Sequence, residues 1–145
     1  MKVLDAAAVI AFMRDEPAAD HVATMLEDRS DRTVISAVNL GEVVDKLARL
    51  GGRSPASVLD RLLWLRAGGL DVLFVDDAIG EAAGQLRARH YARETSALSM
   101  ADCIALATAR REAASLATLD AALARAARAE GVEVIGLPDS TGNRP

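Results

Sequence analysis

The sequence has few cysteines, few aromatic residues and no long apolar run. Its single cysteine, Cys103, excludes a disulfide within the chain and favours a reducing, cytoplasmic setting. Only 3% of the residues are aromatic, which leaves few rings on which nucleobases could stack. No stretch approaches the roughly 20 apolar residues that a membrane span needs. We therefore expect a soluble protein with no membrane partner.

Positive charge and histidine are scarce as well. The 17 basic residues are outnumbered by 21 acidic ones, giving a net charge of −4. This balance argues against a protein that coats nucleic acid by bulk attraction to phosphates, but it allows an enzyme with an acidic, metal-filled centre. The two histidines, His21 and His90, are both expected on exposed helix faces. Chemistry by a histidine pair and a zinc site are therefore both disfavoured.

The sequence does contain enough apolar residues for one packed domain. Of its 145 residues, 51% are hydrophobic, and we expect a single domain over 1–137 followed by a polar tail over 138–145. Short apolar runs predict strands near 3–4, 33–35, 72–75, 116–119 and 132–135. Apolar stripes at helical spacing alternate with these runs. This alternation predicts an α/β fold whose mostly parallel sheet is covered on both faces.

Helix boundaries are marked by capping residues and glycines. We expect seven helices, over 6–13, from Pro17, around 40–50, and over 54–67, 77–90, 99–111 and 120–131. Pro17 is expected in the first turn of the second helix. In the fourth of these, Val58, Leu59, Leu62 and Leu63 are expected to face inward. The polar stretch 91–98 is expected to be a loop, either a substrate-facing lip or a simple connection.

Four acids are predicted to meet at one edge of this sheet. Asp5 ends the first strand, and Asp120 directly follows the fourth. Glu42 and Asp102 are expected in the first turns of helices that start at the same edge. Ligands bind in such sheets beyond the carboxyl ends of the strands.

Each acid also has a purely structural interpretation. Asn39 and Glu42 have the spacing of a capping box, as do Ser99 and Asp102, while Asp5 and Asp120 suit N-caps. Asn39 and Ser99 do not need these acids in order to cap, however. Four crowded carboxylates repel one another unless a cation lies between them, and Mg²⁺ or Mn²⁺ prefers such oxygen ligands. Metal ions held this way can activate water and stabilise the leaving oxygen in phosphodiester cleavage.

Four segments in order resemble the motifs of the PIN domain. They are residues 3–11 (VLDAAAVIA), 35–43 (ISAVNLGEV), 98–107 (LSMADCIALA) and 116–120 (LATLD). Their order and spacing match over nearly the whole chain. Short chains of this kind resemble the VapC toxins of bacterial toxin–antitoxin pairs.

The resemblance carries expectations about fold, site and partners. It implies a three-layer α/β/α sandwich with strand order 3-2-1-4-5 and Mg²⁺- or Mn²⁺-dependent endonuclease action on RNA. It places Asp5, Glu42, Asp102 and Asp120 on the family's metal-binding acids and Thr118 on the polar position beside the last one. It also implies a homodimer and inhibition by a VapB-like antitoxin whose tail reaches the acidic site.

One departure from the family pattern leaves an alternative open. The family usually carries Ser or Thr two residues after the first acid, where this sequence has Ala7. A degenerate PIN fold that binds RNA or protein without cleaving it is therefore the main alternative.

A receiver-like signalling domain is a less favoured alternative. It would need an acid pair after the first strand, a phospho-acceptor such as Asp76 or Asp77, and a lysine after the last strand. Only Asp5 follows the first strand, and the only lysines are Lys2 and Lys46. A phosphatase with an Asp-x-Asp motif would need an acid in place of Ala7. We interpret Asp76 and Asp77 as a helix N-cap instead.

Overall fold

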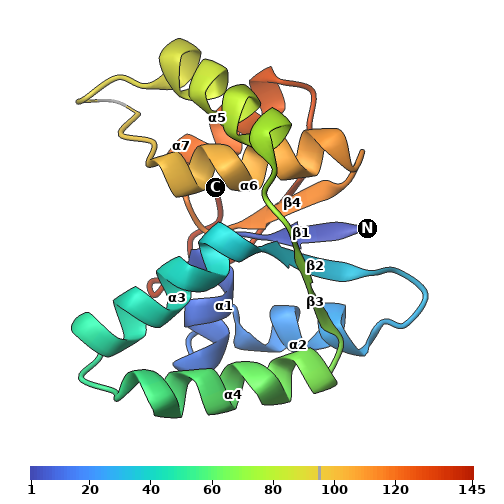
Figure 1. The fold of residues 1–145 in the computed structure, drawn as a ribbon, viewed down its shortest axis with the longest axis vertical. Coiled ribbons are helices and arrows are strands. Elements are labelled where there is room, and N and C mark those ends of the chain that lie inside the picture. The colour runs from blue at the N-terminus through green and yellow to red at the C-terminus, as the bar shows by residue number, and fades with distance from the viewer. Residues whose placement is uncertain (95) are drawn as a thin grey trace.

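The computed structural model describes residues 1–94 and 96–145, so Thr95 of the predicted 91–98 loop lies outside the described residues. Five parallel strands form one sheet in the order β3-β2-β1-β4-β5 (Figure 1). The strands are β1 (Lys2–Leu4), β2 (Thr33–Ser36), β3 (Leu70–Leu73), β4 (Ser115–Thr118) and β5 (Val134–Gly136). The predicted fold class and strand order are therefore confirmed.

Seven helices of the described chain connect and cover these strands. They are α1 (Ala6–Met13), α2 (Ala19–Glu27), α3 (Ala37–Arg49), α4 (Pro55–Ala67), α5 (Asp77–His90), α6 (Met100–Arg111) and α7 (Ala121–Ala129). No helix in the described part of the chain is both long enough and apolar enough to cross a membrane.

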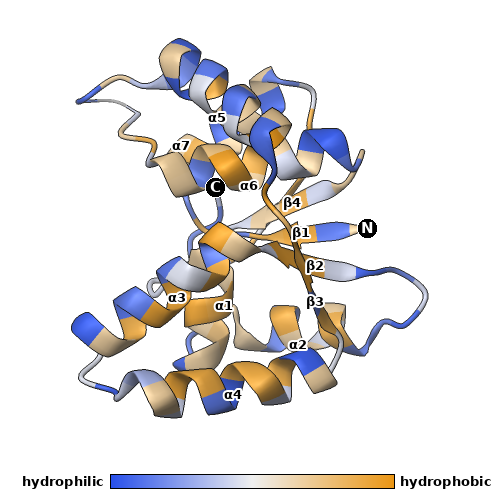
Figure 2. Ribbon diagram, in the orientation of Figure 1, coloured by the Kyte–Doolittle hydropathy of each residue, from blue (hydrophilic) through white to orange (hydrophobic). Residues whose placement is uncertain are grey.

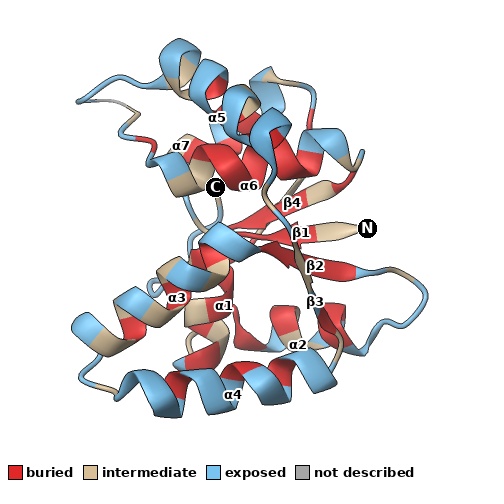
Figure 3. Cartoon of the chain, in the orientation of Figure 1, coloured by how far each residue is buried: buried red, intermediate tan, exposed pale blue. Residues whose placement is uncertain are grey.

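The sheet separates two apolar cores. Val3 on β1 lies in register with Val34 and Leu116, and these side chains pack with α5, α6 and α7. Leu4 points to the opposite face with Ile35, where α1 to α4 cover the sheet. Figures 2 and 3 show the apolar, buried strands between the two helical layers. Because both faces are covered, polar side chains of the strands are accommodated mainly at the strand ends.

Several predicted boundaries are wrong by one to three residues. The third strand starts at Leu70 rather than Val72, because pairing with β2 begins where Leu70 lies opposite Thr33. The fifth strand starts at Val134 rather than Val132, since its register is set by pairing with β4. Pro17 lies in a turn before α2 and not in its first turn, since that helix begins at Ala19.

The face of α4 differs from the predicted apolar stripe. Val58 and Leu62 are buried as expected, but Leu59 and Leu63 are 50% and 60% exposed. Trp64, the only tryptophan, is 79% exposed. It lines a cavity of about 450 Å³ whose other walls include Phe12 of α1 and residues of α2. The α4 helix thus buries a narrow stripe and leaves an apolar surface beside α1 and α2.

Candidate active site

Asp5 lies at the carboxyl end of β1 and is only 2% exposed. It is the N-cap of α1, where its Oδ1 accepts the Ala8 backbone N–H at 2.7 Å. Its Oδ2 accepts the Thr118 hydroxyl at 2.5 Å. Burial is the main cause that raises the pKa of Asp5 to about 7, and the charges of Asp102 and Asp120 act in the same direction. The two hydrogen bonds lower this pKa but do not outweigh the burial.

Thr118 joins the ends of two neighbouring strands. This fully buried residue ends β4, and its hydroxyl oxygen accepts the Asp120 backbone N–H at 2.9 Å while donating to Asp5. Asp120 is exposed and caps α7, because its Oδ1 accepts the N–H groups of Ala122 and Leu123. The predicted N-cap geometry of Asp120 is present, and one hydroxyl fixes both acids relative to each other.

Asp102 is held by the predicted capping box at the start of α6. Its Oδ2 accepts the Ser99 N–H at 2.7 Å, and the Ser99 hydroxyl oxygen accepts the Asp102 N–H at 3.0 Å. Partial burial raises the pKa of Asp102, despite the hydrogen bonds from Ser99, and the charges of Asp120 and Glu42 act in the same direction. The capping role and proximity to the other acids therefore coexist in one side chain.

Glu42 lies in the second turn of α3, not in the first as the capping-box pattern predicted. The helix begins at Ala37 because the Ser36 hydroxyl oxygen accepts the Asn39 N–H at 3.0 Å and caps it three residues earlier. Asn39 is therefore inside the helix, and it is fully buried. Its amide nitrogen donates to the Ala101 carbonyl at 3.1 Å, while its amide oxygen accepts the Ser36 hydroxyl at 2.5 Å. Asn39 thus binds α3, which carries Glu42, to α6, which carries Asp102.

Lys46 is the charged residue of this site that the sequence analysis missed. Its ammonium lies 2.7 Å from Glu42 Oε1, one helical turn along α3. Partial burial lowers the pKa of Lys46, but its bond to Glu42 and the charges of Asp102 and Asp5 outweigh that effect and raise it. The i,i+4 spacing from Glu42 was the available signal, although the same spacing occurs on many exposed helix faces.

The four acids thus lie at one edge of the sheet, close enough for their charges to interact. Among the described residues, however, no three His, Cys, Asp or Glu side chains are arranged with the geometry of a ready-made metal site. Three of the acids, Asp5, Asp102 and Asp120, lie at helix N-termini, where the backbone N–H groups reduce their mutual repulsion. This arrangement can bind a cationic group and can position an electrophile beside several carboxylates.

Comparison with known proteins identifies the fold family. The family model described as the PIN domain matches residues 2–129. This chain belongs to the PIN domain family. No curated protein sequence matches it.

Solved PIN-domain structures resemble the chain over most of its length. FitAcB from Neisseria gonorrhoeae is 25% identical with a TM-score of 0.65, covering 93% of this chain and 96% of that one. VapC20 from Mycobacterium tuberculosis, a sarcin-ricin loop cleaving toxin, is 20% identical with a TM-score of 0.67, covering 87% of this chain and 95% of that one. VapBC-1 from nontypeable Haemophilus influenzae is 19% identical with a TM-score of 0.63, covering 92% and 96%.

The PIN-domain fold also rules out the receiver-like alternative. Receiver-type sheets have strand order 2-1-3-4-5, whereas this sheet has order 3-2-1-4-5. Asp76 is the N-cap of α5, accepting the Ile79 N–H, and its other oxygen pairs with Arg111 at 2.7 Å. It therefore has the capping role that we expected for this position.

Proposed function

We propose that this PIN-domain chain is an endoribonuclease that hydrolyses RNA phosphodiester bonds with Mg²⁺ or Mn²⁺. The observation that carries the proposal is the environment of Asp5, a buried carboxylate whose pKa is raised to about 7 by burial and by two further acids. A fold that maintains such repulsion gains nothing in stability from it. A divalent cation would supply the missing positive charge.

The donor chemistry of the site fits this cation. Asp5, Glu42, Asp102 and Asp120 offer only carboxylate oxygens, which hard divalent cations prefer. When bound, the metal would activate water and neutralise charge that develops on the phosphate. The protein's part is to hold the carboxylates in place. Thr118 fixes Asp5 relative to Asp120, and Ser99 fixes Asp102. Asn39 connects α3, which carries Glu42, to α6, which carries Asp102.

RNA as the substrate is supported by the relatives and not by a pocket for a particular base. VapC20 is described as a toxin that cleaves the sarcin-ricin loop. A charge-based site of this kind recognises the phosphodiester group, so the choice of RNA must come from the surface around it.

The test is cleavage of labelled total RNA by the purified protein with Mg²⁺, with Mn²⁺ and with EDTA. Glu42→Gln should lose cleavage, whereas Asp45→Asn, which removes a neighbouring acid on the same helix, should keep it. Asp45 is a matched control because it forms its own i,i+4 ion pair, with Arg49 at 2.9 Å. Equal cleavage by both variants would reject the proposed site.

The alternative of a degenerate binding module rests on Ala7, which lies in the first turn of α1 beside Asp5. Metal binding without cleavage of any RNA would favour that alternative. The RNA assay, combined with a measurement of Mn²⁺ binding, therefore decides between the two functions.

We also propose that the chain is the toxin of a toxin–antitoxin pair, forms a homodimer, and is inhibited by a VapB-like antitoxin. Support comes from its likeness to the VapBC-1 and FitAcB structures. An antitoxin would have an apolar surface to cover, because Leu63 and Trp64 on α4 are exposed. The single tryptophan makes this testable. Adding a candidate antitoxin should shift Trp64 emission to shorter wavelength and inhibit cleavage, and light scattering should give the mass of a dimer.

A further inference from the structure

Lys46 places a positive charge among the acids at the carboxyl edge of the sheet. Its ammonium is 2.7 Å from Glu42 Oε1, and the charges of Asp102 and Asp5 also act on it. The chain has only two lysines, and the other 15 basic residues are arginines. Of the two lysines, Lys46 is the one that lies among these acids.

The chemistry of lysine differs from that of the arginine ion pair one turn away. Arg49 binds Asp45 with two nitrogens, at 3.0 and 2.9 Å, in the rigid fork geometry of a guanidinium. Lys46 carries a point charge on a flexible stem, and its side chain is 42% exposed. An ammonium on such a stem leaves Glu42 by breaking one contact, whereas a bidentate guanidinium must break two hydrogen bonds at once.

We propose that Lys46 is a positioning residue that holds Glu42 and competes with a divalent cation for it. This inference rests on the proposed metal site. The ammonium repels a cation that approaches Glu42, and it must move away before that cation can bind Oε1, because Lys46 contacts this oxygen. Lys46 therefore weakens metal binding at Glu42 and neutralises part of the acid cluster when the metal concentration is low.

The experiment measures Mn²⁺ binding to the full chain by calorimetry and by electron paramagnetic resonance. Lys46→Met, which keeps the length of the stem, should bind Mn²⁺ roughly three- to tenfold more tightly than wild type, since one nearby repelling charge is gone. Lys46→Arg should restore wild-type or weaker affinity. Arg49→Met removes an ion pair of the same spacing on the same helix and should leave the affinity unchanged.

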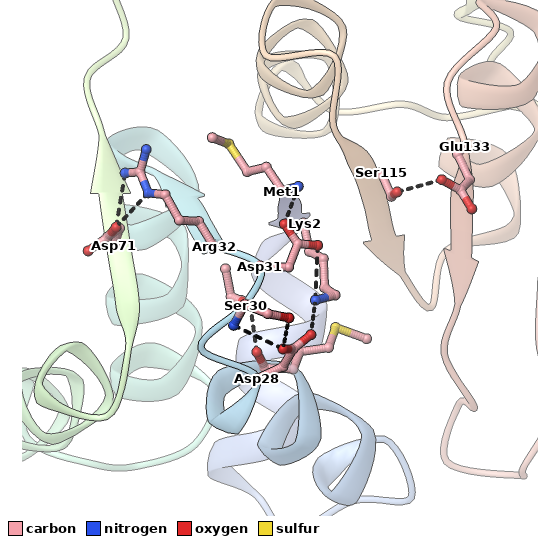
Figure 4. A network of polar contacts seen from close by, with 11 residues as sticks. Met1, Lys2, Asp28, Ser30, Asp31, Arg32, Asp71, Ser115 and Glu133 are labelled. Atoms are coloured by element: carbon pink, nitrogen blue, oxygen red, sulfur yellow. Dashed lines mark hydrogen bonds and ion pairs between the residues drawn. The ribbon is translucent and has the colours of Figure 1, made fainter.

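Thermal unfolding supplies a readout that does not depend on cleavage. In EDTA, Lys46→Met should melt below wild type, because the acids lose their neutralising charge. With saturating Mn²⁺ this difference should shrink or reverse. Lys2→Met is a second control, because Lys2 pairs with Asp28 at 3.0 Å at the other end of the sheet (Figure 4). It should lower the melting temperature equally in both conditions.

The outcomes separate this inference from the proposed function. Equal Mn²⁺ affinity of wild type and Lys46→Met would overturn the competition while leaving the metal site intact. If neither folded protein bound Mn²⁺, the metal site and the competition would both be rejected. A smaller gain from Lys46→Met in a Glu42→Gln background would confirm that Lys46 acts through Glu42.

Discussion

The two ends of the β-sheet both carry acids, but hydrogen bonds and cations lower the pKa values of acids at one end, while burial and neighbouring acids raise them at the other. At the amino end, Asp28 and Asp31 surround Lys2, and Asp31 also binds the N-terminal ammonium (Figure 4). Hydrogen bonds from Ser30 and Lys2 lower the pKa of Asp28 to about 2, and those from the N-terminus and Lys2 lower the pKa of Asp31. At the carboxyl end, burial and neighbouring acids instead raise the pKa of Asp5 to about 7.

This contrast teaches how to distinguish structural acids from candidate functional ones. The side chains are identical in type, so the difference lies in what surrounds them. Acids of the amino end stabilise the folded chain as they stand, whereas those of the carboxyl end keep repelling one another. The proposed metal site would account for a cost of this kind.

The largest expected effect comes from Asp5→Asn. Asparagine is also a good N-cap, so α1 should still form. Cleavage of RNA should fall by roughly a thousandfold, corresponding to about 4 kcal/mol of barrier, because a central carboxylate of the metal site is lost. The same variant should unfold at higher urea in EDTA, since one repelling buried charge is removed. A folded Asp5→Asn protein with normal cleavage would contradict the proposed site.

The pH dependence of stability should also differ between the two ends. The folded-state pKa of Asp5 lies above its unfolded value of 3.8, at about 7. The unfolded chain therefore ionises first, and stability from Asp5 falls as the pH rises from about 4 to about 7, by up to a few kcal/mol. Urea unfolding in EDTA should therefore show that the free energy of unfolding of Asp5→Asn exceeds that of wild type by an amount that grows from about pH 4 to about pH 7.

Asp28 gives the opposite sign and serves as the internal comparison. Its folded-state pKa is depressed to about 2, so its stabilising contribution is present above its ordinary value of 3.8 and is lost only below it. The difference between Asp28→Asn and wild type should therefore stay constant from pH 5 to 8. If the stability difference for Asp28→Asn changed with pH as it does for Asp5→Asn, the proposed difference between the two ends of the sheet would be wrong.

A smaller effect is expected from Thr118→Val. The variant keeps the shape of the side chain but removes the hydroxyl that binds Asp5 and accepts the Asp120 N–H. We expect a loss of about 1–3 kcal/mol of unfolding free energy, because a partly buried N–H loses its acceptor. Cleavage should fall by more than the stability change explains, measured as kcat at a temperature where both proteins are fully folded. Thr141→Val, in the C-terminal turn, should leave cleavage unchanged.

The smallest effect is expected from Ala7→Ser. A serine here restores the hydroxyl that the PIN family usually carries near the first acid. The cleavage rate should rise by roughly twofold to tenfold, because one additional hydrogen bond to a charged group or its bound water stabilises the transition state by an amount of that order. The comparison is initial rates of wild type and variant at equal Mg²⁺. A drop in cleavage would show that the site is already adapted to alanine.

Much of the fold was predictable because local signals agreed with the tertiary structure. Helices α1 and α5 occur with their predicted bounds, and the capping box of Ser99 and Asp102 forms as its spacing indicates. These features depend on neighbours within four residues, which a sequence displays directly. The edge strands β3 and β5 were misplaced, because their register is imposed by pairing partners far away in the chain.

The candidate site divides in the same way. Asp5, Asp102 and Asp120 could be assigned to strand ends and a helix start from sequence order alone, whereas Glu42 was placed one turn too early. The roles of all four acids in metal binding remain proposals. The role of Asn39 could not be predicted, since its partner Ala101 lies 62 residues away. Lys46 was missed because its i,i+4 spacing from Glu42 does not say whether the pair faces solvent or the distant acids Asp5 and Asp102.

The sequence by itself determined the order of elements, several of their caps, and the acids that follow β1 and β4 or begin α6. It could do so because periodicity and capping are short-range properties of the chain. Only the tertiary structure decided that Asp5 is buried against Thr118, that Asn39 joins α3 to α6, and that Lys46 lies among the acids. Burial and the electrostatic environment depend on which distant segments meet, and that is fixed only when the two helical layers pack on the sheet.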